Sequence, residues 1–220
     1  IMMNNNLKIG MEAPDFDAVS TMGDISLSSY KGKWIVFFSH PNDFSPICTT
    51  EIIGLAKADT YFKKINTELI GISVDSLNSH LAWLYDIYLK TGLIVNFPII
   101  ADQNGVIARK YGMISNDVSS TETVRNIFII DDKGIIRSIF VYPMNIGRYI
   151  PEILRTVTAL QYSDQNNCMT PANWSPGNPM IVPPPKTFNA LRERNESINK
   201  NRNGMCWYLS FKNPETKKLE

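Results

Sequence analysis

Apolar and polar positions form blocks along the chain that predict strands and helices in alternation. Residues 34–38 are a continuous apolar run and residues 68–75 a mostly apolar one, as in strands covered on both faces of a parallel or mixed sheet. A helical pattern follows each run, over residues 45–65 and 79–90. The order strand, helix, strand, helix indicates an α/β protein.

The second of these helices has an apolar stripe, because side chains three or four positions apart share a helix face. We expect this stripe to face the core. Its members are Leu81, Leu84, Tyr85, Tyr88 and Leu89.

Shorter elements flank this frame. Residues 16–19 and 24–26 are strand candidates separated by turn signals, and they predict an edge hairpin. Residues 97–101 are a short strand candidate in which Pro98 either confines the strand to an edge or stands at its start. A short helix is expected over residues 104–112.

The following residues predict a hairpin and then a helix. The β-rich runs 124–130 and 135–141 are separated by Asp131-Asp132-Lys133-Gly134, a hairpin signal. Residues 150–162 form the helix, which has a buried apolar stripe. The whole order, with a cysteine in the first turn of the first long helix, is that of the thioredoxin fold, an α/β fold with a central mixed β-sheet flanked by helices.

The composition changes beyond about residue 162 to a proline-rich stretch, followed by a helix expected over residues 186–202 and a strand around residues 205–211. Such a tail is too small to bury a core of its own. We therefore expect a main domain over residues 1–164 and a small C-terminal α+β extension over residues 165–220.

Charge and hydropathy narrow the classes of function. The 220 residues include 22 basic and 21 acidic ones without a basic cluster, so nucleic acid is not an expected partner. No apolar run approaches the roughly 20 residues that a membrane span needs, and the first residues lack the pattern of a signal peptide. We expect a cytoplasmic protein that does not bind membranes.

The three cysteines, Cys48, Cys168 and Cys206, are odd in number and widely spaced. They form no C-x-x-C pair and have no histidine at ligand spacing, so neither a disulfide framework nor a metal site is predicted.

Cys48 has a position that favours reactivity. Ser45 is a favoured N-cap and Pro46 a favoured first residue of a helix, which puts Cys48 at the third helical position. Free N–H groups and the helix dipole favour negative charge there, and the thiolate is the nucleophilic form of cysteine. The alternative is that Cys48 is a small buried apolar residue.

The run Pro41-x-x-x-Ser45-x-x-Cys48 resembles the peroxiredoxin motif P-x-x-x-T/S-x-x-C. The flanks, Phe38-Ser39-His40 before it and Thr49-Thr50-Glu51 after it, are similar too, as is Arg125 at the start of a later strand. The resemblance extends over residues 7–212. It implies a thiol-dependent peroxidase that reduces hydrogen peroxide and alkyl hydroperoxides, becomes a sulfenic acid and serves antioxidant defence.

The resemblance also implies a role for each matching residue. Cys48 would attack the peroxide, with donors from the Ser45 hydroxyl, the Cys48 backbone N–H and the Arg125 guanidinium. Pro41 would shield the sulfur, and Glu51 would orient Arg125. For an isolated arginine a surface ion pair would be the ordinary interpretation, and for Glu51 a solvated helix charge.

Three further residues have less specific roles. His40 resembles the histidine of the one-cysteine class, which either hydrogen-bonds the peroxide or the oxidised sulfur or has a structural role. Arg148 resembles a second arginine of the pocket. His80 matches no motif, and we interpret it as structural.

The tail indicates the one-cysteine, peroxiredoxin-6-like class, because Thr170 precedes Pro171 where two-cysteine relatives have the resolving cysteine. An external thiol such as glutathione, thioredoxin or glutaredoxin would then reduce Cys48, with no bound cofactor. A resolving role for Cys168 stays open, and Cys206 is expected to be packed in a strand. The resemblance implies a homodimer.

Two other functions remain as alternatives. A holdase or redox relay would use exposed apolar surface and pass oxidation on to a partner. A thioredoxin-type disulfide exchanger is disfavoured, because Ser45 occupies the place of the first cysteine of C-x-x-C.

Overall fold

The computed structural model describes residues 7–213. The chain divides into two compact units, Ile1–Ile150 and Pro151–Glu220, so the helix α4 (Ile150–Asn166) lies almost wholly in the second. The boundary expected at residue 164 stays a prediction from composition.

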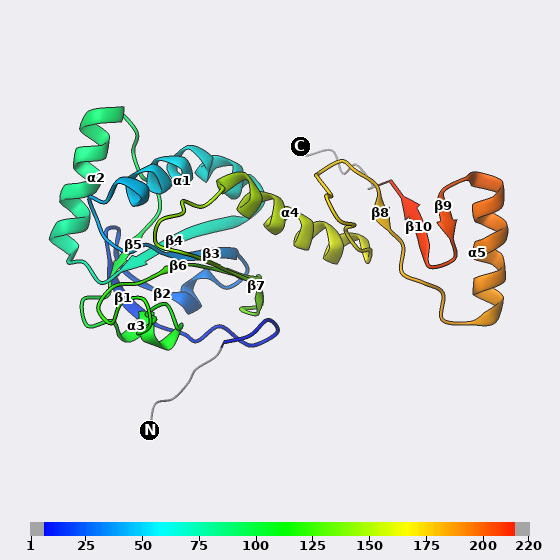
Figure 1. Cartoon of the computed structure of the whole chain (residues 1–220), viewed down its shortest axis with the longest axis horizontal. Coiled ribbons are helices and arrows are strands. Elements are labelled where there is room, and N and C mark those ends of the chain that lie inside the picture. The colour runs from blue at the N-terminus through cyan, green and yellow to red at the C-terminus, as the bar shows by residue number, and fades with distance from the viewer. Residues whose placement is uncertain (1–6, 214–220) are drawn as a thin grey trace, which may run out of the picture. The chain divides into compact units, whose positions relative to one another are not determined.

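The first unit contains a mixed seven-stranded sheet with the strand order β2-β1-β5-β4-β3-β6-β7 (Figure 1). Its strands are β1 (Asp17–Ser20), β2 (Gly23–Ser26), β3 (Trp34–Ser39), β4 (Thr67–Ser73), β5 (Ile99–Ala101), β6 (Arg125–Ile130) and β7 (Ile136–Tyr142). β3 pairs in parallel with β4 and antiparallel with β6. All residues of β3 and β6 are buried, as expected for strands covered on both faces.

The thioredoxin-type order of elements is confirmed. The strands β1 and β2 form the expected hairpin at one edge of the sheet, and β6 and β7 form the hairpin expected around Asp131–Gly134. Pro98 directly precedes β5, which is an inner strand between β1 and β4, so the proline stands before the strand.

Four helical segments of the first unit connect the strands: η1 (Leu27–Tyr30), α1 (Pro46–Lys64), α2 (Leu77–Thr91) and α3 (Val106–Lys110). In the view of Figure 1, α1 lies above the sheet and α3 below it. Ser45 caps α1 by accepting a hydrogen bond from the Cys48 N–H, and Ser76 caps α2 in the same way. The predicted start of α1 is therefore correct.

The predicted buried stripe of α2 is wrong. Four of its members, Leu81, Tyr85, Tyr88 and Leu89, are exposed, and the buried residues of α2 are His80, Trp83 and Ile87. Both sets have helical spacing, so apolar periodicity alone favoured the wrong face. The buried face is held by polar contacts: His80 bonds to Asp43 and to the Ile100 carbonyl, and the Trp83 indole N–H donates to Thr49 Oγ1 at 3.2 Å.

The two faces of β3 contribute to different parts of the interior. Phe37 joins an aromatic cluster with Phe16, Tyr111 and Phe128, in which neighbouring ring centroids are 4.9 to 6.2 Å apart. Phe38 points to the opposite face, because successive side chains of a strand alternate. There it contacts Phe97 and lies 5.3 Å from the Arg148 guanidinium.

The second unit contains α4, the helix α5 (Phe188–Asn201) and a small sheet with the order β8-β10-β9. Its strands are β8 (Met180–Ile181), β9 (Gly204–Cys206) and β10 (Leu209–Lys212). The single strand predicted around residues 205–211 is wrong, because the chain turns at Trp207 and Tyr208 and Leu209 pairs back on Cys206. A side chain at Gly204 would stand 2.7 Å from the Leu209 carbonyl oxygen, so this close approach requires glycine.

Candidate active site

Cys48 lies at the end of the sheet where β3 meets the first turn of α1. Ser45 Oγ accepts a hydrogen bond from the Cys48 N–H at 3.3 Å, and the Cys48 side chain is fully buried. Among the described residues, no acceptor is present for the Ser45 hydroxyl hydrogen. That hydrogen is therefore available to a bound molecule.

Arg125 reaches Cys48 from the neighbouring strand. β6 runs antiparallel to β3 with Phe38 opposite Ile127, so Arg125 at the start of β6 lies at the end of β3. Its Nη1 is 3.3 Å from Cys48 Sγ and 2.8 Å from Glu51 Oε2. Nε and Nη2 both donate to the Met144 carbonyl, at 3.0 and 2.8 Å, which holds the guanidinium in one orientation.

Glu51 joins Arg125 to a second arginine. Arg148 Nε donates to Glu51 Oε1 at 2.9 Å and Nη2 to Glu51 Oε2 at 2.6 Å, a bidentate pair. Arg148 Nη1 also donates to the carbonyls of Ser39 and Asn126. Cys48, Glu51, Arg125 and Arg148 are 0%, 3%, 2% and 6% exposed, so the whole group lies out of solvent.

The structure thus brings together five of the predicted site residues: Ser45, Cys48, Glu51, Arg125 and Arg148. Pro41 is buried in the loop between β3 and α1. The Met144 carbonyl was not predicted, since a backbone group carries no sequence signal.

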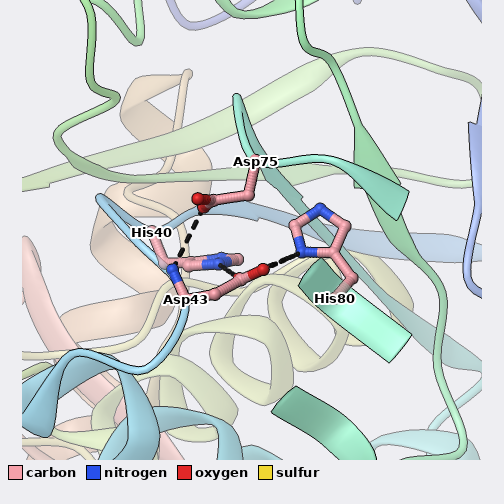
Figure 2. Close-up of side chains that lie close together, drawn as sticks. All are labelled: His40, Asp43, Asp75 and His80. Carbon is pink, nitrogen blue, oxygen red and sulfur yellow. Dashed lines mark hydrogen bonds and ion pairs between the residues drawn. The ribbon is translucent and has the colours of Figure 1, made fainter. Parts of the chain in front are cut away.

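His40 belongs to a second buried group, shown in Figure 2. Its Nε2 lies 2.9 Å from Asp43 Oδ1, and Asp43 also bonds to His80 Nδ1 at 2.8 Å. Burial lowers the pKa of His40, more than its bond to Asp43 raises it. Burial would raise the pKa of Asp43, but the bonds from both histidines outweigh it and hold that pKa well below its usual range.

The sequence did not predict this second group. The interpretation of His80 as structural is consistent with its contacts, whereas Asp43 belongs to no motif that marks it in the sequence. The available signal was that His40 and Asp43 stand only three positions apart in the loop between β3 and α1.

The cysteines of the tail are free in the structure. Cys168 is buried within the second unit, and Cys206 at the end of β9 is half-buried, so it is less packed than expected.

Comparison with known proteins defines the class. The pattern of the AhpC/TSA family matches residues 9–139, and that of the C-terminal domain of 1-Cys peroxiredoxin matches residues 159–197. The chain belongs to the peroxiredoxins, within their one-cysteine group, and is therefore a thiol-dependent peroxidase.

Individual relatives span nearly the whole chain. Peroxiredoxin 2 of Caldanaerobacter subterraneus subsp. tengcongensis is 52% identical over 207 residues, which are 93% of this chain and 92% of the relative. A yeast mitochondrial 1-Cys peroxiredoxin has a TM-score of 0.82 and 39% identity, covering 94% of this chain and 99% of the other. A cysteine-to-serine mutant of peroxiredoxin 6 of Arenicola marina has a TM-score of 0.83 and 31% identity, covering 96% and 100%.

Proposed function

We propose that Cys48 is the cysteine that reduces peroxide. Its thiolate attacks one peroxide oxygen, the O–O bond breaks, and the other oxygen leaves with a proton as water or an alcohol. The sulfur is oxidised to sulfenic acid and the peroxide is reduced by two electrons.

The contact of Arg125 Nη1 with Cys48 Sγ is the observation that carries this proposal. With Cys48 as thiolate, two negative groups, Cys48 and Glu51, and two positive groups, Arg125 and Arg148, share one buried site and their charges cancel. With Cys48 as thiol, the same site keeps an unbalanced positive charge. Buried charges are tolerated when they are paired, so the site has a counter-charge for the nucleophilic form of the sulfur.

The neighbouring residues supply what the attack needs. Negative charge develops on both peroxide oxygens, and the Ser45 hydroxyl and the Arg125 guanidinium are donors beside the sulfur. Glu51 and Arg148 hold Arg125 in place, and Pro41 shields the sulfur from water. His40 Nδ1 is buried without a partner among residues 7–213, so it is free to bond a peroxide oxygen or the oxidised sulfur.

The second half of the reaction requires an external thiol. Thr170 stands before Pro171, so the resolving cysteine of two-cysteine relatives is absent from that position. The study of the yeast neighbour describes thiol resolution through the glutathione and thioredoxin systems. We infer that glutathione, thioredoxin or glutaredoxin reduces the sulfenic acid here, with Cys168 as the alternative to be tested.

Assembly and location are part of the proposal. β7 is the last strand of the sheet. Its first residue, Ile136, exchanges backbone hydrogen bonds with Gly10 and Met11, but the outer edge from Ser138 to Tyr142 has no neighbouring strand among the described residues and can pair with β7 of a second copy around a twofold axis. We infer a homodimer, to be tested by light scattering with gel filtration.

We also infer a cytoplasmic protein, since its free thiols suit a reducing compartment. No helix within residues 7–213 is long and apolar enough to cross a membrane.

The test is peroxide consumption with dithiothreitol by the native protein and by three variants. Cys48→Ser should abolish turnover, whereas Cys168→Ser and Cys206→Ser should retain it. Turnover in Cys48→Ser equal to that of the native protein would refute the assignment. A Cys48-dependent disulfide after one equivalent of peroxide, absent in Cys168→Ser, would show a two-cysteine cycle.

A further inference from the structure

His40, Asp43, Asp75 and His80 point toward one another from three segments of the chain: the loop after β3, the loop after β4, and α2 (Figure 2). Each offers one nitrogen or oxygen atom, and these four atoms all lie within 4.8 Å of one another. Both histidines are fully buried, Asp43 is buried, and Asp75 is half-buried. No step of the proposed peroxide reaction uses Asp75 or His80.

The hydrogen bonds of His80 define which of its nitrogens faces the cluster. Nε2 lies 3.1 Å from the Ile100 carbonyl oxygen, which only accepts, so Nε2 carries a hydrogen. In a neutral imidazole Nδ1 then has a lone pair, yet it faces both carboxylate oxygens of Asp43, at 3.0 and 2.8 Å. Two acceptors at this distance require a positive charge between them, either a proton or a metal cation.

The net charge of the cluster distinguishes these two possibilities. Asp43 and Asp75 contribute two negative charges, and a single proton between His80 Nδ1 and Asp43 would balance only one of them. Asp75 Oδ2 accepts hydrogen bonds from Ser73 Oγ and the Asp43 N–H, while Asp75 Oδ1 has no partner among the described residues. A divalent cation bound to two neutral histidines and two carboxylates would balance both charges and use this free oxygen.

We propose that His40, Asp43, Asp75 and His80 form a binding site for a first-row divalent metal ion, with Zn²⁺ as the reference cation. Imidazole and carboxylate are the ligands that such ions accept, and four of them suit tetrahedral zinc. The bond from His80 Nε2 to the Ile100 carbonyl is the outer contact that commonly orients a metal-ligating histidine.

Binding requires modest movement. Ligand atoms about 2.1 Å from zinc stand about 3.4 Å apart in a tetrahedron. The Asp43 oxygens must therefore move away from His40 and His80, now 2.9 and 2.8 Å distant, by about half an ångström, and the longer separations must shorten. The half-buried Asp75 side chain is the one with room to move inward.

Binding has a consequence for His40. If Nε2 binds the metal, the single proton of the neutral ring moves to Nδ1, which changes from acceptor to donor. Ligating groups must be deprotonated, so zinc uptake should release protons and weaken as the pH falls.

The test is calorimetric titration of the full chain with Zn²⁺, after chelator treatment, in a Cys48→Ser/Cys168→Ser/Cys206→Ser background that removes thiolate ligands. We expect one zinc ion per chain, and a heat that changes with the ionisation enthalpy of the buffer because protons are released. Co²⁺ should give the visible absorption of a tetrahedral nitrogen and oxygen site.

Matched variants locate the site. His80→Gln and Asp75→Asn should each weaken zinc binding at least about 100-fold, whereas Asp86→Asn, which removes an exposed partner of Lys90 on the same helix, should leave it unchanged. If circular dichroism shows that His80→Gln does not fold, the zinc affinity of Asp75→Asn decides whether the ion binds at this cluster, because the Asp75 side chain is only half-buried. If the cysteine-free protein shows no saturable zinc binding, a shared proton alone holds the cluster together. If Asp75→Asn binds zinc as tightly as its background, the ion binds elsewhere. Either result overturns the proposal.

Discussion

Two buried carboxylates near the end of β3 are each held between two basic side chains, yet their partners differ in kind. Glu51 lies between Arg125 and Arg148, whose guanidinium groups stay charged at any physiological pH. Asp43 lies between His40 and His80, whose imidazole groups, unlike a guanidinium, can be neutral. The first group therefore keeps a constant positive field at Cys48, whereas the basic side chains of the second group are not permanently charged.

Among the variants that compare the two groups, Glu51→Gln should have the largest effect on stability. It leaves two buried guanidinium groups without a counter-charge. We expect a loss of about 3–5 kcal/mol in the free energy of unfolding, measured by chemical denaturation. The control is Glu68→Gln. The partner of Glu68 is the exposed Lys33, 3.5 Å away, so this variant should lose less than about 1 kcal/mol in the free energy of unfolding. Equal losses in both variants would mean that the Glu51 group adds no more stability than a surface pair.

Arg125→Gln tests the fixed charge directly. Removal of one preorganised donor to a developing negative charge typically costs about 10²–10³ in rate, so we expect a decrease of that size in the rate constant with hydrogen peroxide. Rapid-mixing measurement of a single turnover isolates this step from reduction by thiol. Arg155→Gln, which removes a half-exposed pair with Glu152, should react at the native rate. A native rate in Arg125→Gln would exclude its role as a donor.

The pH dependence of stability probes the histidine group. The pKa of His40 is lower in the folded state than in the unfolded chain, where it is about 6.5, so protonation favours unfolding and stability is lost as the pH falls below that value. Between pH 6 and pH 5 this contributes a slope of up to about 1.4 kcal/mol per pH unit, which should be missing in His40→Gln. An unchanged slope in His40→Gln would contradict the lowered pKa.

Asp43 affects the pH dependence of stability at lower pH than His40 does. Its folded pKa lies below the unfolded value of about 3.9, so its contribution is present above that pH and is lost as the pH falls further. The two residues therefore affect separate parts of a denaturation profile.

The smallest expected effect is on stability, in a pair of serine variants that distinguishes helix capping by Ser45 from its role in catalysis. Ser45→Ala removes the N-cap of α1 and should cost about 1 kcal/mol of stability. Ser76→Ala removes the equivalent cap of α2 and should cost a similar amount. Only Ser45→Ala should also slow the reaction with peroxide, because only this hydroxyl bonds to the backbone N–H of Cys48. A native rate in Ser45→Ala would limit the residue to capping.

Helix and strand order could be predicted because it depends on local patterns. The apolar runs and the capping sequence Ser45-Pro46 carry their own signals, and the structure has these elements close to the expected positions. The choice of buried face on α2 depends instead on Asp43, Ile100 and Thr49, which are distant in sequence. The tight turn at Trp207 and Tyr208 also lacked a signal, since neither residue is typical of turns.

The sequence by itself determined the class of protein, because the residues from Pro41 to Cys48 are contiguous and resemble the peroxiredoxin motif, which can be recognised without the fold. Only the tertiary structure decided how the charges are paired. Arg125 meets Cys48 because β6 pairs with β3, and His80 meets Asp43 because α2 turns one face inward. Burial then requires each charge to have a counter-charge, a condition set by distances across the fold and not by neighbours along the chain.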